Sequence, residues 1–203
     1  YRVRFDFVDG QSWERGDPYS FLPTLGDADL YFFGEGTHRR LWHALGAHLR
    51  TVDGVEGASF AVWAPNARRV SVIGDFCGWD GRLLPMRGLG ASGVFELFVP
   101  GVSAGARYKY EIKTASGELR IKADPFAFAC EHPPANASVV TAASFAWEDA
   151  EWMTARRDRD PARAPMSIYE VHLGSWRRKA DGSPLGYREV AKPLLDHVVR
   201  HGF

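Results

Sequence analysis

Two titratable side chains in the run SIYEVHLGSW, residues 167–176, are candidates for acid–base chemistry. Glu170 and His172 lie in a segment that we expect to be a strand, because the apolar residues Ile168, Val171 and Leu173 accompany them. Carboxylic acids and imidazoles are the groups that most often transfer protons in enzymes. The alternative is a structural strand whose polar groups are satisfied by neighbouring elements. Three further carboxylates lie in turns without a spacing that predicts a site: Glu35, Glu56 and Asp75.

Residues 51–145 carry the pattern that would have to position any binding side chains. The runs ASFAVWAP, RRVSVIGDF, GVFELFVP and RYKYEIK are short, and Gly, Pro, Asn and Asp separate them. In RYKYEIK, Tyr108 and Tyr110 point to one side and Lys109 points to the other. Several strands at this spacing predict a mainly β fold, an immunoglobulin-like antiparallel sandwich. We expect its core to contain Tyr108 and Tyr110 together with Phe60 and Trp63.

Residues 1–21 and 108–128 align with one another without a gap. Each copy reads as a strand, a turn containing glycine, a second strand and an Asp-Pro stop, at Asp17-Pro18 and Asp124-Pro125. We interpret the match as a duplication, so that residues 1–21 form the C-terminal end of a preceding β-sandwich. The alternative is a chance likeness between two hairpins.

The remaining segments read as linkers and as one strand–helix unit. Residues 22–50 are expected to be a helical linker that packs on its neighbours, and residues 146–164 a second linker with one short helix. Residues 165–203 read as strand, loop and helix, which is the opening unit of an α/β array. Because proline is tolerated best in the first turn of a helix, Pro193 predicts a main helix that begins near Lys192.

Composition excludes some functions. Lys plus Arg (25) equals Asp plus Glu (25), so the chain lacks the basic balance of a nucleic-acid or membrane-surface protein. No apolar run approaches the roughly 20 residues of a membrane helix. Cys77 and Cys130 have no metal spacing, and we expect free thiols rather than a disulfide, which fits a reducing, cytoplasmic location.

Several stretches together resemble the 1,4-α-glucan (glycogen) branching enzymes. They are VWAPNA, GDFCGWDG, YKYEI, LRIKADPFAF and YEVHLGSW followed by GYREV, in the order and spacing of that family. The resemblance covers most of residues 40–203 and implies an architecture. Residues 51–145 would be a family 48 carbohydrate-binding module, and residues 165–203 the first βα unit of a truncated family 13 (β/α)8 barrel.

The resemblance also implies an activity for the parent protein. Branching enzymes cleave an α-1,4 link of glycogen and transfer the chain segment to a 6-hydroxyl, with no metal or organic cofactor. Their catalytic carboxylates lie on later barrel strands, so we expect no catalytic residue in this chain and no activity of the chain alone. Glu170 and His172 then read as structural residues. The expected partners are the α-glucan and the rest of the parent's barrel, and we expect the parent to be a monomer.

Two alternatives to that activity remain. The chain could be a non-catalytic glycogen-binding module, which the strand–helix unit at residues 165–203 argues against. It could instead come from a glycogen debranching enzyme or isoamylase, which shares both domain types; the stretches GDFCGWDGR and GSWRR favour branching.

Trp79 and Lys109 match the glucan-binding positions of related modules. An indole can stack on the apolar face of a glucose ring, and an ammonium can donate hydrogen bonds to its hydroxyls. The second stacking Trp of such sites is absent, because the region after Gly117 reads ELRIKADP. The site should therefore be weak. The alternative, which that absence favours, is that Trp79 packs on the barrel and Lys109 is solvated.

Overall fold

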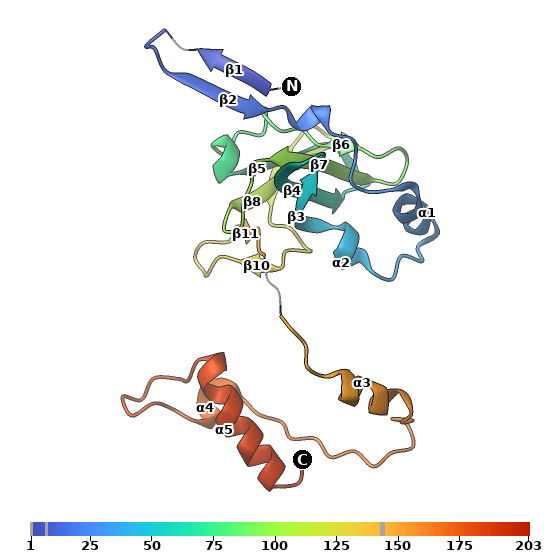
Figure 1. The fold of residues 1–203 in the computed structure, drawn as a ribbon, viewed down its shortest axis with the longest axis vertical. Coiled ribbons are helices and arrows are strands. Elements are labelled where there is room, and N and C mark those ends of the chain that lie inside the picture. Colours follow the sequence, from blue (N-terminus) through green and yellow to red (C-terminus); the bar gives the residue numbers. More distant parts are fainter. Residues whose placement is uncertain (1, 7, 143–144) are drawn as a thin grey trace. The chain divides into compact units, whose positions relative to one another are not determined.

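The structure is a computed structural model that describes residues 2–6, 8–142 and 145–203. The chain divides into two compact units, Tyr1–Ser144 and Phe145–Phe203 (Figure 1). The first unit holds all of the named strands and the second holds helices α3 to α5.

A four-stranded antiparallel sheet forms one layer of the first unit, in the order β3-β4-β7-β6. Asp53 and Gly54 connect its first two strands, and both have positive φ (50° and 76°). This geometry is that of a two-residue hairpin turn whose twist matches the flanking strands, which explains the Asp-Gly pair. The bounds are β3 Gly46–Val52, β4 Val55–Trp63, β6 Arg87–Gly88 and β7 Val94–Pro100.

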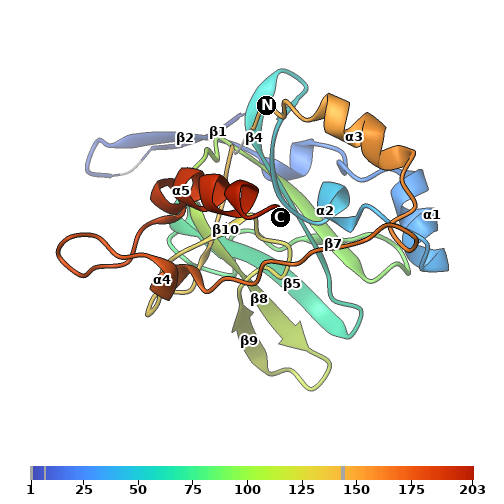
Figure 2. The ribbon, with the colours of Figure 1, turned by 90° about the horizontal axis from the view of Figure 1, so that it is seen from below.

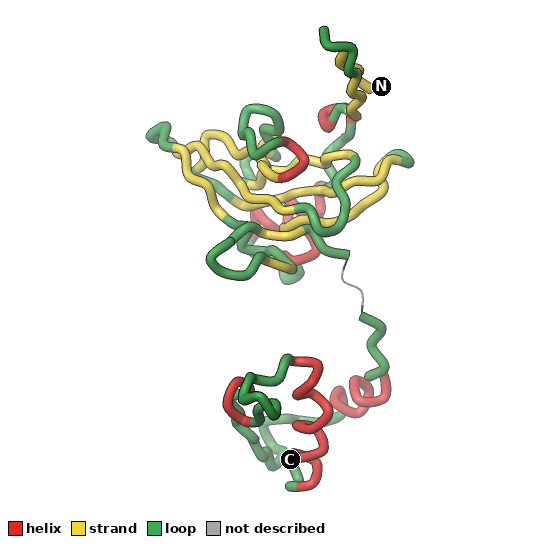
Figure 3. Tube along the Cα trace, turned by 90° about the vertical axis from the view of Figure 1, so that its left-hand side faces the viewer, coloured by secondary structure: helices red, strands yellow, loops and turns green. Residues whose placement is uncertain are grey.

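A five-stranded antiparallel sheet forms the second layer, and Figure 3 shows the strands of the two layers in yellow. Strand β8 is its centre: one edge pairs with β5, and the other pairs with β11 at one end and with β9 at the other. Figure 2 shows the β8–β9 hairpin extending from this sheet. The bounds are β5 Ala67–Gly74, β8 Arg107–Thr114, β9 Leu119–Lys122, β10 Ala129–Cys130 and β11 Ser138–Val139.

The core lies between the sheets and confirms most of the predicted core residues. Phe60, Tyr108 and Tyr110 are buried, and the rings of Phe60 and Tyr108 meet edge to face with centroids 5.0 Å apart. Trp63 contradicts the prediction, because 57% of its side chain is exposed. It ends β4 one residue after the inward-facing Val62, so its side chain emerges on the other face, where its Nε1 donates to the Ser92 carbonyl (3.2 Å).

The expected linker at residues 22–50 covers the outer face of the four-stranded sheet. It forms helices α1 (Asp27–Glu35) and α2 (Leu41–Ala44), and β3 begins within it at Gly46. Just before it, Phe21 forms an edge-to-face pair with Phe98, with ring centroids 4.8 Å apart. Nearby, the backbone N and Oγ1 of Thr24 donate to Glu96 Oε1 (3.1 and 2.9 Å). Burial of Glu96 raises the pKa of its carboxyl. This segment therefore belongs to the packed body of the unit.

The two aligned segments both form antiparallel hairpins with the same register. In the first, β1 (Arg2–Asp6) pairs with β2 (Ser12–Gly16), so that Asp6 lies opposite Ser12. In the second, the aligned residues Lys113 and Leu119 lie opposite one another. The likeness extends beyond sequence to strand pairing. That residues 1–21 end a preceding sandwich stays a prediction.

The second unit departs from the expected strand–helix unit in its first half. Residues 165–172 have no strand conformation, and a short helix, α4 (Leu173–Trp176), covers the end of the predicted strand. A strand is stabilised by hydrogen bonds to a neighbour, and no strand within the described range pairs with this segment. A short helix, α3 (Ala150–Arg157), lies within the expected linker at 146–164.

The predicted start of the last helix is also wrong. Helix α5 runs from Tyr187 to Arg200 and contains Pro193 in its interior. Its N-terminus is fixed upstream of the proline, because Gly186 N donates to Glu189 Oε2 (2.8 Å) and Lys179 Nζ lies 2.8 Å from Glu189 Oε1. These contacts hold the first turn in place despite the missing proline N–H.

Both cysteines are free thiols, as expected; Cys77 is buried and Cys130 is exposed. Among the helices in the described ranges, none is both long and apolar enough to cross a membrane.

Candidate carbohydrate-binding site

Trp79 lies in a tight turn that follows the last residue of β5, Gly74. The chain forms one turn of 3-10 helix over Asp75–Cys77, and Trp79 N donates to the Gly74 carbonyl (3.1 Å). A glycine is required at 74, because a Cβ there would lie 2.3 Å from the backbone oxygen of Arg107. Trp79 itself has φ 62°, in the left-handed region that a bulky side chain rarely adopts, and its side chain is 39% exposed.

Lys109 lies on the neighbouring strand β8, next to the point where this turn begins. Tyr108 pairs with Gly74 and Lys109 pairs with Ile73. Because side chains alternate along a strand and Tyr108 points into the core, Lys109 points to the outer face, as predicted. Its Nζ donates to Asn136 Oδ1. Trp79 and Lys109 are thus presented at the same end of two paired strands.

A network of charged groups runs along the same end of the sheet. Asp75 Oδ2 accepts from Arg107 Nε (2.9 Å) and Oδ1 accepts from Arg107 Nη2 (3.0 Å), so the guanidinium binds the carboxylate through two donors. Asp75 Oδ1 also accepts from Trp79 Nε1 (3.3 Å). Arg107 Nη1 donates to Glu131 Oε1 (3.4 Å). The hydrogen bond from Arg107 lowers the pKa of the Asp75 carboxyl, which is therefore ionised at neutral pH.

This arrangement suits a neutral, polyhydroxylated ligand. It offers a partly exposed indole, an ammonium group and an amide oxygen at one end of the sheet. An indole can contact the apolar face of a sugar ring, and the two polar groups can contact its hydroxyls. The described residues hold no group of three or more His, Cys, Asp or Glu side chains that could bind a metal ion.

Sequence reasoning missed three residues at this end of the sheet: Asn136, Asp75 and Arg107. Asp75 is a turn carboxylate whose spacing predicts no site, and its partner Arg107 lies 32 residues away. Asn136 lies 27 residues from Lys109. Only the pairing of β5, β8 and β11 brings these residues together. The local sequence offers one signal for such a residue: in the run PPANASVV, the polar Asn136 lies two residues before a short β run.

Glu170 and His172 do not form an acid–base pair with one another. Both side chains are exposed. His172 precedes α4, and its Nδ1 lies 2.8 Å from Ser175 Oγ, a contact typical of a residue that organises the start of a helix. Glu35 accepts a hydrogen bond from the hydroxyl of Tyr31 (2.6 Å) within α1.

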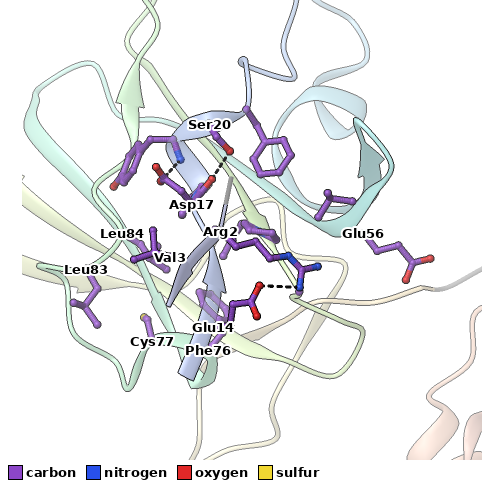
Figure 4. Close-up of a pocket in the computed structure, with 18 of the residues that line it drawn as sticks. Arg2, Val3, Glu14, Asp17, Ser20, Glu56, Phe76, Cys77, Leu83 and Leu84 are labelled. Carbon is purple, nitrogen blue, oxygen red and sulfur yellow. Dashed lines mark hydrogen bonds and ion pairs between the residues drawn. The ribbon is translucent and has the colours of Figure 1, made fainter. Parts of the chain in front are cut away.

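An open groove of about 1890 Å³ lies beside the Asp75–Cys77 turn, between the sandwich and the β1–β2 hairpin (Figure 4). Arg2 and Glu14 of the hairpin form an ion pair along it (3.4 Å). Phe76, Leu83 and Leu84 line the opposite wall, as Figure 4 shows. Neither Trp79 nor Lys109 lines this groove, but Asp75 does, so the groove adjoins the candidate site at this turn.

Comparisons with known proteins show what the chain is similar to. Residues 44–127 match the family model of carbohydrate-binding module 48, the isoamylase N-terminal domain. The whole chain is 55% identical to the 1,4-alpha-glucan branching enzyme GlgB of Nocardia farcinica, of which it covers 27%, and 57% identical to that of Myxococcus xanthus, of which it covers 28%. The chain thus spans about a quarter of the length of these relatives.

Among solved structures, a pullulanase from Bacillus acidopullulyticus matches with 24% identity and a TM-score of 0.38, over 48% of this chain and 11% of that one. By the family model, residues 44–127 are similar to carbohydrate-binding module 48, and by sequence identity the whole chain is similar to part of a 1,4-alpha-glucan branching enzyme.

Proposed function

We propose that this chain is part of a cytoplasmic 1,4-α-glucan branching enzyme, and that its β-sandwich binds α-glucan weakly through Trp79 and Lys109. The observation that carries the first half is the identity of 55% along the whole chain with a branching enzyme. The second half rests on the presentation of Trp79 and Lys109 at one end of paired strands.

The reaction of the parent would cleave an α-1,4 bond, hold the released chain covalently on a carboxylate, and pass it to the 6-hydroxyl of another glucose. A retaining enzyme of this kind needs two carboxyl groups roughly 5–5.5 Å apart across the sugar. No such role falls to Glu170 or to the other carboxylates considered above. In this proposal the catalytic pair belongs to parts of the parent outside these 203 residues.

Residues 165–203 would contribute the first strand and helix of a barrel. Helix α5 supports this role, because it has an apolar stripe that begins at the buried Val190. Further apolar side chains of this region are exposed: Leu195 and Val199 on the helix and Ile168 before it. In a barrel, neighbouring strands would supply the hydrogen bonds that residues 165–172 lack here. The exposed apolar side chains would be covered at the same time.

Glucan binding would use stacking for affinity and hydrogen bonds for orientation. Trp79 would cover the apolar face of one glucose ring. The Lys109 ammonium and the Asn136 side chain, which already lie in contact, would reach hydroxyls at its edge. With a single aromatic platform, the affinity should be in the weak range and should depend on the many chain ends and segments that one glycogen particle offers.

Affinity electrophoresis in gels containing glycogen tests the proposal. Trp79→Ala and Lys109→Met should each lose most of the retardation, a weakening of about tenfold or more for the Trp, which corresponds to roughly 1.4 kcal/mol. Trp42→Ala and Lys113→Met are matched controls, since Trp42 is exposed on α2 and Lys113 lies on the same strand as Lys109. Equal retardation of all variants would remove Trp79 from the site, and no retardation of the unaltered chain would remove the binding function.

A further inference from the structure

We infer that Arg107 is the positioning residue of the candidate glucan site: its guanidinium holds the stacking Trp79 on one side and the Asn136 loop on the other. The inference rests on the proposed function for the identity of the ligand. It goes beyond that function by assigning a role to a side chain that need not contact the ligand.

Three donors of one guanidinium reach two carboxylates. Nε and Nη2 bind both oxygens of Asp75 at 2.9 and 3.0 Å, and Nη1 reaches Glu131 Oε1 at 3.4 Å. A planar guanidinium that binds a carboxylate through two parallel bonds fixes its direction as well as its distance. Arg107 therefore sets the positions of two carboxylates on opposite sides of its own strand.

The Asp75 side of this arrangement controls the tryptophan. With both oxygens held by Arg107, Asp75 Oδ1 accepts from Trp79 Nε1 (3.3 Å). The backbone of Trp79 is in a conformation that favours glycine (φ 62°), so the turn has little intrinsic preference for presenting a tryptophan there. A residue held in a sparsely populated backbone region persists when the surrounding contacts over-determine it. The Asp75–Arg107 pair supplies such a contact to the end of the indole.

The Glu131 side controls the loop that carries Asn136. Glu131 Oε2 accepts from Ala137 N (3.0 Å), and Glu131 N donates to the Ala137 carbonyl (2.9 Å), so the loop between them is closed at its base. Asn136 directly precedes Ala137, and its side chain meets Lys109. A change at Arg107 would thus shift Asn136 and, through its contact with Asn136, Lys109.

Stability alone does not explain this network. Arg107, Asp75 and Glu131 retain side-chain exposures of 52%, 35% and 22%, and ion pairs this exposed contribute little to folding. Preorganisation of a binding surface is a different effect, because side chains held before binding lose less freedom when the ligand arrives. The network is therefore expected to matter for binding more than for unfolding.

The test uses the 203-residue chain labelled with 5-fluorotryptophan, with the Trp79 resonance identified by its loss in Trp79→Phe. Arg107→Met should shift or broaden the Trp79 fluorine signal in the absence of ligand and weaken glycogen binding at least about fivefold, with the unfolding temperature nearly unchanged. Arg107→Lys should not restore binding, since an ammonium cannot bind Asp75 through a planar fork. Arg120→Met is the control, because it removes a similarly exposed arginine of the same sheet that forms an ion pair with Glu118.

The outcomes separate the inference from the proposed function. An unmoved Trp79 signal in Arg107→Met overturns the inference, and if binding is lost nonetheless, Arg107 is a direct glucan contact. A moved signal in a protein that never binds glycogen supports the positioning of Trp79 and overturns the proposed function. Equal shifts in Arg107→Met and Arg120→Met also overturn the inference, because the effect would then belong to the sheet as a whole.

Discussion

The hairpins β1–β2 and β8–β9 have aligned sequences and the same local structure, but their surroundings differ. Val3 lies opposite Arg15 in the first, and the aligned Tyr110 lies opposite Lys122 in the second. Their turn glycines, Gly10 and Gly117, have φ of 84° and 92°. The Asp-Pro stops also agree: Asp17 Oδ1 accepts from the N of Tyr19, and Asp124 Oδ1 accepts from the N of Phe126, both at 2.8 Å. Local sequence is therefore sufficient for the hairpin and its stop.

The environments of the two stops are different. Asp124 is buried and accepts from the hydroxyls of Tyr108 (2.7 Å) and Tyr110 (3.2 Å), while its own N donates to Ser138 Oγ (2.9 Å). In the first hairpin the residue that aligns with Tyr110 is Val3, which is 37% exposed. Burial raises the pKa of Asp124 and of both tyrosines. The comparison shows that the sequence motif sets the geometry, and the sandwich core sets what that geometry contributes to stability.

The largest difference should appear when the two aspartates are removed. Asp124→Ala removes the carboxylate that accepts from two buried hydroxyls, of which that of Tyr110 has a second acceptor, the Ala61 carbonyl (3.5 Å). It should lower the free energy of unfolding by about 3 kcal/mol. Asp17→Ala removes the cap of a short helical turn and should cost about 1 kcal/mol. Urea unfolding followed by fluorescence gives both values. Equal losses would mean that the buried contacts of Asp124 add nothing to the cap.

The two turn glycines should behave alike, since a Cβ would meet open space at both. Gly117→Ala should lower stability by about 1 kcal/mol, because its left-handed conformation strains any other residue. Gly10→Ala should weaken the β1–β2 hairpin by a similar free energy. Its amides should then exchange hydrogen about five times faster, because 1 kcal/mol corresponds to about a fivefold change in the opening equilibrium. If Gly117→Ala is tolerated without loss, the shared turn geometry is not what fixes the two registers.

Trp79 extends the comparison to a left-handed position occupied by a bulky residue. Trp79→Gly should be more stable than Trp79→Ala by about 1 kcal/mol, because glycine relieves the backbone at φ 62° and alanine does not. Both variants should lose glycogen binding equally. Thermal unfolding beside affinity electrophoresis measures the two effects, and equal stability of the two variants would show that the turn is unstrained.

The pH dependence of stability should show the burial of Asp124 as a smaller effect. Burial raises the pKa of Asp124 in the folded state above its unfolded value, so the protonated form is favoured in the fold. Its contribution to stability is full below the unfolded pKa and is lost as pH rises through the folded pKa. Asp124→Asn should flatten this decline. Glu96, whose pKa is also raised by burial, needs Glu96→Gln as a parallel control in the same urea series.

Local patterns predicted much of the fold. The alternation in RYKYEIK correctly places Tyr108 and Tyr110 inside and Lys109 outside. The expectation that Trp63 is a core residue fails, because Trp63 follows the inward-facing Val62 and its side chain therefore lies on the other face of β4. The expected strand at residues 167–172 also fails, because an apolar pattern forms no strand without a partner strand.

The candidate site was predicted only in part, for a similar reason. Trp79 and Lys109 could be named because each sits in a recognisable short motif. The contacts among Asp75, Arg107 and Glu131 join residues 32 and 24 positions apart. Such contacts depend on strand order and register, which no local motif encodes.

The central claim is that this sandwich is an α-glucan-binding module with Trp79 as its platform, and glycogen affinity electrophoresis of the unaltered chain beside Trp79→Ala tests it most directly. The account predicts retardation of the unaltered chain, loss of that retardation in Trp79→Ala, and its retention in Trp42→Ala. Retardation that survives Trp79→Ala, or that is absent from the unaltered chain, would contradict it.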